Sequence, residues 1–329
     1  MAGTLTVASK EFKDQFGSKR FLILFGLVAL LGSLSAYQGV DFIRNNTNMS
    51  FVQIFSGTRM GFSFIQIMVF FGPLLGLALG FDSVNKERAN GTLSIVLGQP
   101  IYRDSVINGK FLAGAAALIT LTFGSIIIMS GISLTMLGFA PTLEEVLKIC
   151  ALALLTAVYL LLWLSVGILY SVVFKRTSTS ILFSIATWMT FSIVISIVAV
   201  ALASALVPVS GGGFIVVQDG QGGQDMNFTR GDPGRFQVSN EYVQAMQERA
   251  ALQAKLEKIS PTQLYQDTAS AILGTSSFGF GRQEFQRTTT LTEALANNWA
   301  NIAVLTIVMV VAFAASYMMF LRTEIRPGE

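Results

Sequence analysis

The sequence predicts an all-α polytopic membrane protein with six transmembrane helices. Hydrophobic residues make up 52% of the chain and charged residues 12%, and the mean hydropathy is +0.61. A soluble domain typically devotes about a quarter of its residues to charge. Apolar runs near the ~20 residues that a helix needs to cross a bilayer recur along the chain. Lipid is therefore the expected solvent for most of the protein.

Six apolar runs account for the predicted spans. They are Phe21–Tyr37, Gly61–Phe81, Phe111–Phe139, Ile149–Phe174, Ile181–Val209 and Asn301–Leu321. The third and fifth runs are long enough to tilt or to protrude beyond the ~30 Å hydrocarbon layer. None of the six runs contains Asp, Glu, Lys or Arg. Because coupling to an ion gradient usually needs ionisable groups inside the bilayer, this absence argues against an ion-coupled secondary transporter.

Residues 1–20 are expected to form an amphipathic helix that lies in the membrane interface. Its apolar residues recur at helical spacing, and its charged residues occupy other positions. The apolar residues are Leu5, Ala8, Phe12 and Phe16. The alternative is a cleaved signal peptide over Lys19–Ala36, since a basic pair precedes an apolar run there. The long charged leader before Lys19 argues against that alternative.

Lysines and arginines in short loops predict the orientation, because cytoplasmic loops of membrane proteins are enriched in them. One side of the predicted bundle collects most of these residues, namely Lys10, Lys13, Lys19, Arg20, Lys86, Arg88, Arg103, Lys110, Lys175, Arg176, Arg322 and Arg326. The short loops of the other side hold Arg44, Arg59 and Lys148. We therefore expect a multi-pass plasma-membrane protein with cytoplasmic N- and C-termini, including a cytoplasmic tail over residues 322–329.

The loop between the fifth and sixth spans is expected to form a mainly helical extracellular domain over residues 210–300. Its first part, Ser210–Arg235, is rich in Gly, Asp and Gln and has a short strand pattern near Phe214–Val217. Capping patterns predict three helix starts, at Ser239, Ser260–Pro261 and Thr290. The first of these helices is expected to run to Ile259, and the third to lead into the last span.

Three Asn-x-Ser/Thr tripeptides on the predicted outside are candidate N-glycosylation sites. They begin at Asn45, Asn48 and Asn227. Asn90-Gly91-Thr92 has the same form but lies on the predicted inside. A glycan at Asn90 would therefore invert the predicted topology.

The motifs of an enzyme or of a molecular motor are missing from the sequence. The chain has no histidine, and its one cysteine, Cys150, lies in an apolar run where it suits a packing role. No G-x-x-x-x-G-K-[ST], G-x-S-x-G or H-E-x-x-H pattern occurs. We therefore expect a non-catalytic subunit without cofactors of its own. The basic residues are scattered at span ends, so nucleic-acid binding is not expected either.

The predicted cytoplasmic loop between the second and third spans is the segment on which a partner would act. Residues 82–97 carry charges at one end and apolar residues at the other, with Gly91 between them. Asp82 is expected to pair with Lys86 one helical turn later. Gly98-Gln99-Pro100 then breaks the segment, and Ile101–Lys110 forms a second short amphipathic piece with Arg103 exposed. The alternative interpretation is an ordinary solvated loop.

The order of residues around this loop resembles the ABC-2 type permease family, the membrane subunits of type V ABC exporters. The resemblance runs through Phe81-Asp82, Lys86-Glu87-Arg88, Gly91-Thr92-Leu93, Gln99-Pro100, Arg103 and Gly109-Lys110-Phe111. A second stretch, Ser260-Pro261-Thr262-Gln263-Leu264-Tyr265, is similar to the helix start before the last span in the branch with a large external loop. The interfacial helix, the six spans and the termini also fit, so the resemblance covers nearly the whole chain.

The resemblance implies a permease paired with a second, identical or homologous permease, and docked on two ATP-binding cassette (ABC) ATPase subunits that bind ATP and Mg. It also implies that residues 82–97 form the coupling helix and that spans two and five line the seam between the permeases. The residues implied in coupling are Glu87, Arg88, Gly91, Thr92 and Arg103. Glu87 and Arg88 would contact the ATPase, Gly91 would permit close approach, and Arg103 would brace the second cytoplasmic helix.

Two other classes of function remain open at this point. A membrane scaffold or assembly factor would use the external helices to bind a partner, but it would not need the coupling pattern. An ion-coupled transporter would need charges inside the spans. Phe62, Phe64, Phe70 and Phe71 give span two an aromatic, uncharged surface, and lipid contact or core packing is the favoured interpretation for most of them. An uncharged pathway would suit amphipathic or hydrophobic cargo.

Overall fold

The computed structural model describes residues 2–45, 50–56, 63–92, 102–208, 214–216, 236–238, 240–274 and 290–322. Within these residues six helices are long and apolar enough to cross a membrane, which confirms the predicted fold class. The first half holds α1 (Ala2–Phe16), α2 (Lys19–Asn45), the 3-10 helix η1 (Phe51–Phe55), α3 (Phe64–Gly80), α4 (Asn85–Ala89), α6 (Arg103–Leu137) and α7 (Leu143–Val173). The second half holds α8 (Thr177–Met189), the π-helix η2 (Thr190–Val194), α9 (Ile195–Leu206), β1 (Phe214–Val216), β2 (Phe236–Val238), α10 (Asn240–Glu257), α11 (Pro261–Leu273) and α12 (Leu291–Arg322).

The helices are longer than the apolar runs that predicted them. Helix α6 begins at Arg103 instead of Phe111, and α12 begins at Leu291 instead of Asn301. A hydrogen-bonding cap explains the extension of α12, since the Thr290 hydroxyl accepts from the Glu293 backbone N–H and the Glu293 carboxylate accepts from the Thr290 backbone N–H. Thr142 and Glu145 form the same cap before α7. The apolar runs therefore predicted the apolar parts of these helices and not their full length.

The chain divides into two compact units, one of residues Met1–Ser192 with Ser260–Glu329 and one of residues Ile193–Ile259. The division differs from the expected domain over residues 210–300. Helix α11 packs against α7, α12 and α3 inside the first unit, because its buried face includes Leu264, Tyr265 and Ile272. An apolar helix face of this kind is buried wherever a matching surface lies next to it.

The smaller unit contains a helix pair and a short β-hairpin. Helix α10 packs on α9, and β1 pairs antiparallel with β2, with Phe214 opposite Val238. The strand expected at Phe214–Val217 is thus confirmed as β1, while its partner β2 was not predicted. The expected cap Ser239 lies outside the described residues, although α10 follows directly at Asn240.

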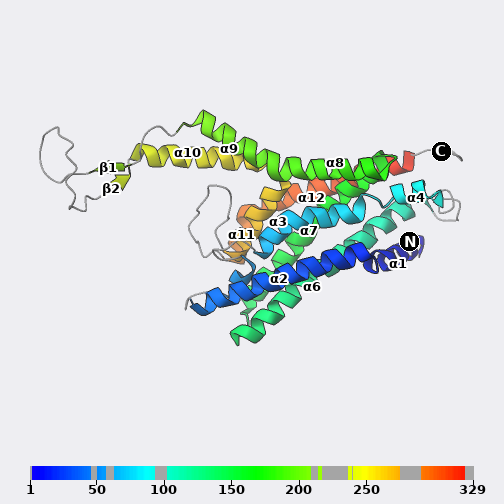
Figure 1. Ribbon diagram of the computed structural model, residues 1–329, viewed down its shortest axis with the longest axis horizontal. Helices are drawn as coiled ribbons and strands as arrows, with labels where there is room; N and C mark the ends of the chain where they lie inside the picture. The colour runs from blue at the N-terminus through cyan, green and yellow to red at the C-terminus, as the bar shows by residue number, and fades with distance from the viewer. Residues whose placement is uncertain are drawn as a thin grey trace, which may run out of the picture. The chain divides into compact units, whose positions relative to one another are not determined.

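Within the larger unit, α7 lies at the centre of the bundle. It packs against α3, α6, α8, α11 and α12. Its side chains Tyr159 and Trp163 are among the largest fully buried groups of the described chain. Figure 1 shows α1 and α4 at the same end of this bundle, where α12 also ends. This end of the larger unit is called the α4 end below.

Helix α3 approaches α7 at backbone distance through glycines spaced four residues apart. A Cβ atom at Gly76 would lie 2.7 Å from the Leu160 carbonyl oxygen, and one at Gly80 would lie 2.7 Å from the Leu164 carbonyl oxygen. On the α7 side, a Cβ atom at Gly167 would lie 3.1 Å from the Gly80 Cα. Small residues at this spacing let two membrane helices pack closely. The α3–α7 pair therefore forms a tightly packed unit.

Adding one methyl group to this interface should destabilise the fold. We expect Gly76→Ala to lower the free energy of unfolding by about 1–3 kcal/mol, because α7 backbone atoms must move to admit the Cβ. Thermal unfolding of the purified chain in detergent measures the change. Gly131→Ala is the matched control, since nothing lies within 4 Å of its added Cβ, and it should leave the melting temperature equal or higher. Equal melting temperatures for the two variants would contradict the close packing.

Candidate functional site

The turn that joins α3 to α4 is held in place by two buried serine hydroxyls. The Ser171 Oγ of α7 accepts hydrogen bonds from the backbone N–H groups of Val84 (2.9 Å) and Asn85 (3.1 Å). The Ser180 Oγ of α8 donates to the Phe81 carbonyl oxygen at 2.9 Å. Val84 and Asn85 are fully buried. Since a buried backbone group without a partner is costly, these bonds specify where the turn can sit.

A buried lysine lies between two carboxylates at the same end of the bundle. The Lys110 Nζ of α6 is 2.7 Å from the Glu87 Oε1 of α4 and 3.1 Å from the Glu11 Oε1 of α1. The Lys110 side chain is 2% exposed. A buried ammonium is stable only when it is paired and hydrogen-bonded. The three residues, called the Lys110 cluster below, therefore link α1, α4 and α6 to one another.

Helix α1 reaches this cluster because a glycine precedes Lys110. A Cβ atom at Gly109 would lie 2.7 Å from the Val7 Cγ1 and 3.2 Å from the Ala8 backbone nitrogen. Glu11 follows Val7 by one helical turn, so the contact at Gly109 places its carboxylate beside the ammonium. The Gly109-Lys110 pair thus has two separate roles, since the glycine admits α1 and the lysine holds Glu11.

A second ion pair joins the turn to the start of α2. The Arg20 Nη1 lies 2.5 Å from the Asp82 Oδ2, and the Arg20 Cζ lies 5.7 Å from the centre of the Phe81 ring. The expected partner of Asp82 was Lys86, and that expectation was wrong. Helix α2 begins beside the turn and supplies a guanidinium that both pairs with the carboxylate and stacks on the aromatic ring.

The structure places the predicted coupling residues in different surroundings. The Glu87 Oε1 is in the Lys110 cluster, and its Oε2 is buried without a hydrogen-bond partner in the described residues. Arg88 is half-buried, and its side chain makes no ion pair or hydrogen bond within the same described residues. The Thr92 Oγ1 donates to the Glu87 carbonyl oxygen at 3.3 Å. Arg103 is exposed at the first position of α6. Of the predicted set, the structure thus brings Glu87 and Thr92 together.

Gly91 is needed for the backbone conformation of this segment. Its φ angle is +69°, in the left-handed region that residues with a side chain rarely adopt. Nothing lies within 4 Å of a Cβ atom built at this position. Close approach of a partner at Gly91 therefore remains a prediction. The end of the expected coupling helix, residues 93–97, lies outside the described residues.

The candidate glycosylation sites can be placed only in part. Asn45 is exposed at the last position of α2, and its Nδ2 donates to the Asp41 carbonyl oxygen at 2.9 Å. Asn48 and Asn227 lie outside the described residues. Glycosylation of the three sites stays a prediction.

Sequence reasoning missed Glu11 and the structural role of Lys110. Lys110 directly precedes the third predicted span, and because α6 begins at Arg103, Lys110 lies within this helix, where its side chain is buried. The signal was the position of Lys110 within a run of helix-compatible residues that continues upstream of Phe111. Its two partners lie 23 and 99 residues away in the chain, so no local pattern could identify them.

The second sequence stretch that carried the family resemblance forms another buried contact. Ser260 precedes α11, and its hydroxyl donates to the Phe191 carbonyl oxygen of η2. The Tyr265 ring of α11 stacks on the Tyr159 ring of α7 with centres 4.4 Å apart, and the Tyr265 hydroxyl lies 3.0 Å from the Thr156 hydroxyl. Burial raises the pKa of Tyr265, so the hydroxyl is neutral and serves as a hydrogen-bonding group.

The contacts of α11 extend to helices on both sides of it. The Ser192 hydroxyl of η2 lies 2.8 Å from the Thr262 hydroxyl, and the Tyr159 hydroxyl donates to the same Thr262 oxygen at 3.3 Å. The Asn301 amide of α12 donates to the Thr268 hydroxyl at 3.4 Å. Helix α11 thus joins α7, η2 and α12 by polar contacts away from the α4 end.

The fold and these contacts define a multi-pass helical membrane protein with a polar, tightly anchored turn at one end of its bundle. The family described as ABC-2 family transporter protein matches residues 5–325, so the chain belongs to this family. It is also similar to the probable ABC transporter permease protein NosY of Pseudomonas aeruginosa, with 26% identity over 146 residues. That match covers 44% of this chain and 50% of the relative, so it spans about half the length of the relative.

Removing the lysine should destabilise the bundle, because two carboxylates would lose their buried counter-ion. We expect Lys110→Met to lower the free energy of unfolding by about 3–5 kcal/mol. Combining it with Glu87→Gln should restore part of that loss, since one uncompensated charge is removed. Unfolding of the purified chain, followed by thermal or denaturant titration, measures both effects.

Lys86→Met is the matched control for this prediction. Lys86 is exposed on the same short helix, so its replacement should change stability by less than about 0.5 kcal/mol. Equal effects of Lys86→Met and Lys110→Met would show that the Lys110 cluster does not hold the helices together.

Proposed function

We propose that the chain is the permease subunit of an ABC exporter whose energy comes from two separate ATPase subunits that bind ATP and Mg. Membership in the ABC-2 family supports the transporter class, and the similarity to a probable ABC permease supports the subunit. The observation that carries the proposal is the anchoring of the α3–α4 turn and α4 to four other helices. Hydrogen bonds and ion pairs join them to α2, α6, α7 and α8, and α1 is joined to them through Lys110 of α6.

The anchoring of the α3–α4 turn suits a segment that receives force from the ATPase and passes it to the helical bundle. A load on α4 reaches α6 and α1 through the Lys110 cluster, and it reaches α7 through Ser171. Packed helices move as units because their interfaces do not deform continuously. The α3–α7 contact through Gly76 and Gly80 then carries the movement along the bundle. Beyond it, Tyr159 and Thr262 connect α7 to α11 and η2.

The exposed part of the segment is its proposed docking surface for the ATPase. Lys86, Asn90, Gly91 and Thr92 are exposed, and Arg88 is half-buried without a hydrogen bond or ion pair in the described part of the chain. Arg88 is therefore the residue that we propose to contact the ATPase. Glu87 faces Lys110 instead, so its proposed role is to pass the movement of α4 to α6. We propose that Arg103, the exposed first residue of α6, stabilises the cytoplasmic start of that helix.

Large apolar surfaces of the single chain are uncovered, which supports a second permease in the complex. Of the most apolar stretch of Thr177–Leu206, 11% of the residues are buried, against 67% for the span that contains α3. Helix α3 contributes a narrow stripe at four-residue spacing, in which Phe70 is exposed and Gln66, Leu74 and Ala78 are half-buried. We propose that an identical or homologous permease covers this stripe and part of span five. Phe64, fully buried, is excluded from the stripe, and Phe62 lies outside the described residues.

The proposed orientation puts the α4 end and both termini in the cytoplasm of a cell whose plasma membrane holds the protein. The lysines and arginines of the short loops support it. The external region then includes the loop after α9, and the uncharged surface of α3 suits amphipathic or hydrophobic cargo. The proposed direction of transport is outward, because the residues around the α3–α4 turn resemble those of type V ABC exporters.

Charge reversal at Arg88 should uncouple the ATPase from the permease. The complex purified from its native membrane should contain a Walker-motif ATPase, and in nanodiscs the wild-type permease should change its ATP hydrolysis rate. We expect Arg88→Glu to reduce that change by on the order of tenfold, as a lost interfacial charge contact costs about 1–3 kcal/mol. Folding, checked by gel filtration, should be unaffected.

Lys255→Glu is the control, because Lys255 is an exposed lysine on α10. It reproduces the loss of a positive charge and the gain of a negative one, and it should leave the hydrolysis rate as in wild type. Absence of any ATPase from the native complex, or equal rates for Arg88→Glu and wild type, would refute the assignment of the docking surface.

Labelling of single cysteines should reveal the orientation. In a Cys150→Ser background, a membrane-impermeant maleimide applied to intact cells should label Phe139→Cys and leave Asn90→Cys unlabelled. Both positions are exposed, and they follow helices that end on opposite sides of the bundle. Permeabilised cells should label both. Labelling of Asn90→Cys alone in intact cells would invert the proposed topology.

A further inference from the structure

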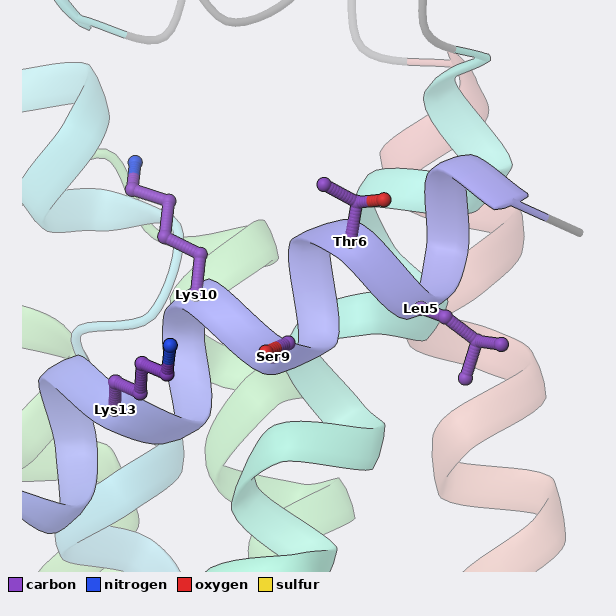
Figure 2. Close-up of a pocket in the computed structure, with 5 residues that line it drawn as sticks. All are labelled: Leu5, Thr6, Ser9, Lys10 and Lys13. Atoms are coloured by element: carbon purple, nitrogen blue, oxygen red, sulfur yellow. The ribbon is translucent and has the colours of Figure 1, made fainter.

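Helix α1 presents two lysines on a side that no other helix of the described residues covers. Lys10 and Lys13 are exposed, and so are the nearby residues Thr6 and Ser9. With Leu5 these residues line a shallow hollow on the surface of α1. Figure 2 shows the two lysine side chains near one end of the hollow, while Leu5 points away from them at the other end.

The positive charge of this surface is not cancelled by the acidic residues of the same helix. The Glu11 carboxylate is turned to the opposite side, where Lys110 neutralises it. Lys10 and Lys13 make no ion pair within the described part of the chain, and Lys19 adds a further exposed cation at the start of α2. Asp14 is the one exposed carboxylate of α1, so the described surface keeps a positive excess.

An apolar edge lies beside the lysines. Leu5 is 66% exposed and Phe16 is 40% exposed, and the Phe16 ring stacks on Phe12 with centres 5.4 Å apart. Two residues, Gly17 and Ser18, separate α1 from the membrane-spanning α2. Helix α1 is therefore held at the level where a span enters the bilayer. An exposed leucine and phenylalanine at that level can be covered by acyl chains.

We propose that this face of α1 binds the headgroups of anionic phospholipids in the adjoining leaflet. Lys10 and Lys13 supply the charge, the Ser9 hydroxyl donates a hydrogen bond to a phosphate oxygen, and Leu5 and Phe16 enter the acyl region. A lipid surface fits better than a protein partner because cationic and apolar residues form adjacent strips along one helix. The lipid-binding face is opposite to the Lys110 cluster, so α1 connects the bilayer to the segment next to α4.

Native mass spectrometry of the purified permease, without any ATPase, tests the proposal. The chain is held in nanodiscs of phosphatidylcholine mixed with phosphatidylglycerol and then released with its retained lipids. We expect the Lys10→Gln/Lys13→Gln variant to retain phosphatidylglycerol with an affinity lower by on the order of tenfold at low salt. Retention by wild type should fall as the salt concentration rises, since surface charges are screened. Leu5→Ser/Phe16→Ser should also weaken retention.

The control is Lys255→Gln/Lys258→Gln, which removes the same charge from exposed positions of α10 and its following turn. It should retain phosphatidylglycerol as wild type does. Millimolar inorganic phosphate should not displace the lipid, because a free anion lacks the acyl chains that Leu5 and Phe16 contact. Equal retention by both lysine variants would overturn the proposal, and displacement by inorganic phosphate would replace the lipid surface with a discrete phosphate site. Because no ATPase is present, these outcomes do not depend on the proposed transport function.

Discussion

The pairing of Lys110 is the constraint on which the α4 end of the structure depends. An ammonium group with 2% of its side chain exposed needs carboxylates beside it, and these come from α1 and from α4. Both helices have other contacts as well, since Ser171 binds the backbone N–H of Asn85 in α4 and Gly109 admits α1 against α6. The buried ammonium then ties α4 and α1 to each other.

The other anchors of the turn act together with this cluster. Ser171 and Ser180 bind backbone groups that would otherwise be buried without partners, and Arg20 binds Asp82 from outside. The three kinds of contact come from different helices, so the turn cannot move without moving them or breaking bonds. Close contact between α3 and α7 extends the same body toward α11. This is the arrangement expected of an element that transmits force instead of absorbing it.

Sequence alone predicted the parts of the structure that depend on local composition. Apolar runs gave the six spans, and Ser260-Pro261 gave the start of α11, because both signals are read from neighbouring residues. The glycines at 72, 76 and 80 were visible as a four-residue repeat, but their meaning depends on the helix that faces them. The Lys110 cluster depends on residues far apart in the chain, and the π-helical segment η2 has no sequence signal of comparable strength.

The functional residues also divide into a part that local sequence order identified and a part whose role depends on long-range contacts. The segment around Glu87 was recognised from the order of its residues, but its position in the structure changes the role proposed for it. Glu87 faces inward to Lys110, so Arg88 is the better candidate for contact with an ATPase. Gly91 was predicted to permit close approach of a partner, whereas the property visible in the structure is its left-handed backbone.

In the proposed transporter, α4 and the α3–α7 pair move as one body when the ATPase binds nucleotide. Double electron–electron resonance on the complete complex measures this directly, with spin labels at the exposed positions Asn90 and Leu143 of one permease. The distance within the chain should be unchanged when a non-hydrolysable ATP analogue is bound, while the distance between Asn90 labels of the paired permeases should change. A nucleotide-dependent distance within the chain, with no change between the permeases, would contradict the account.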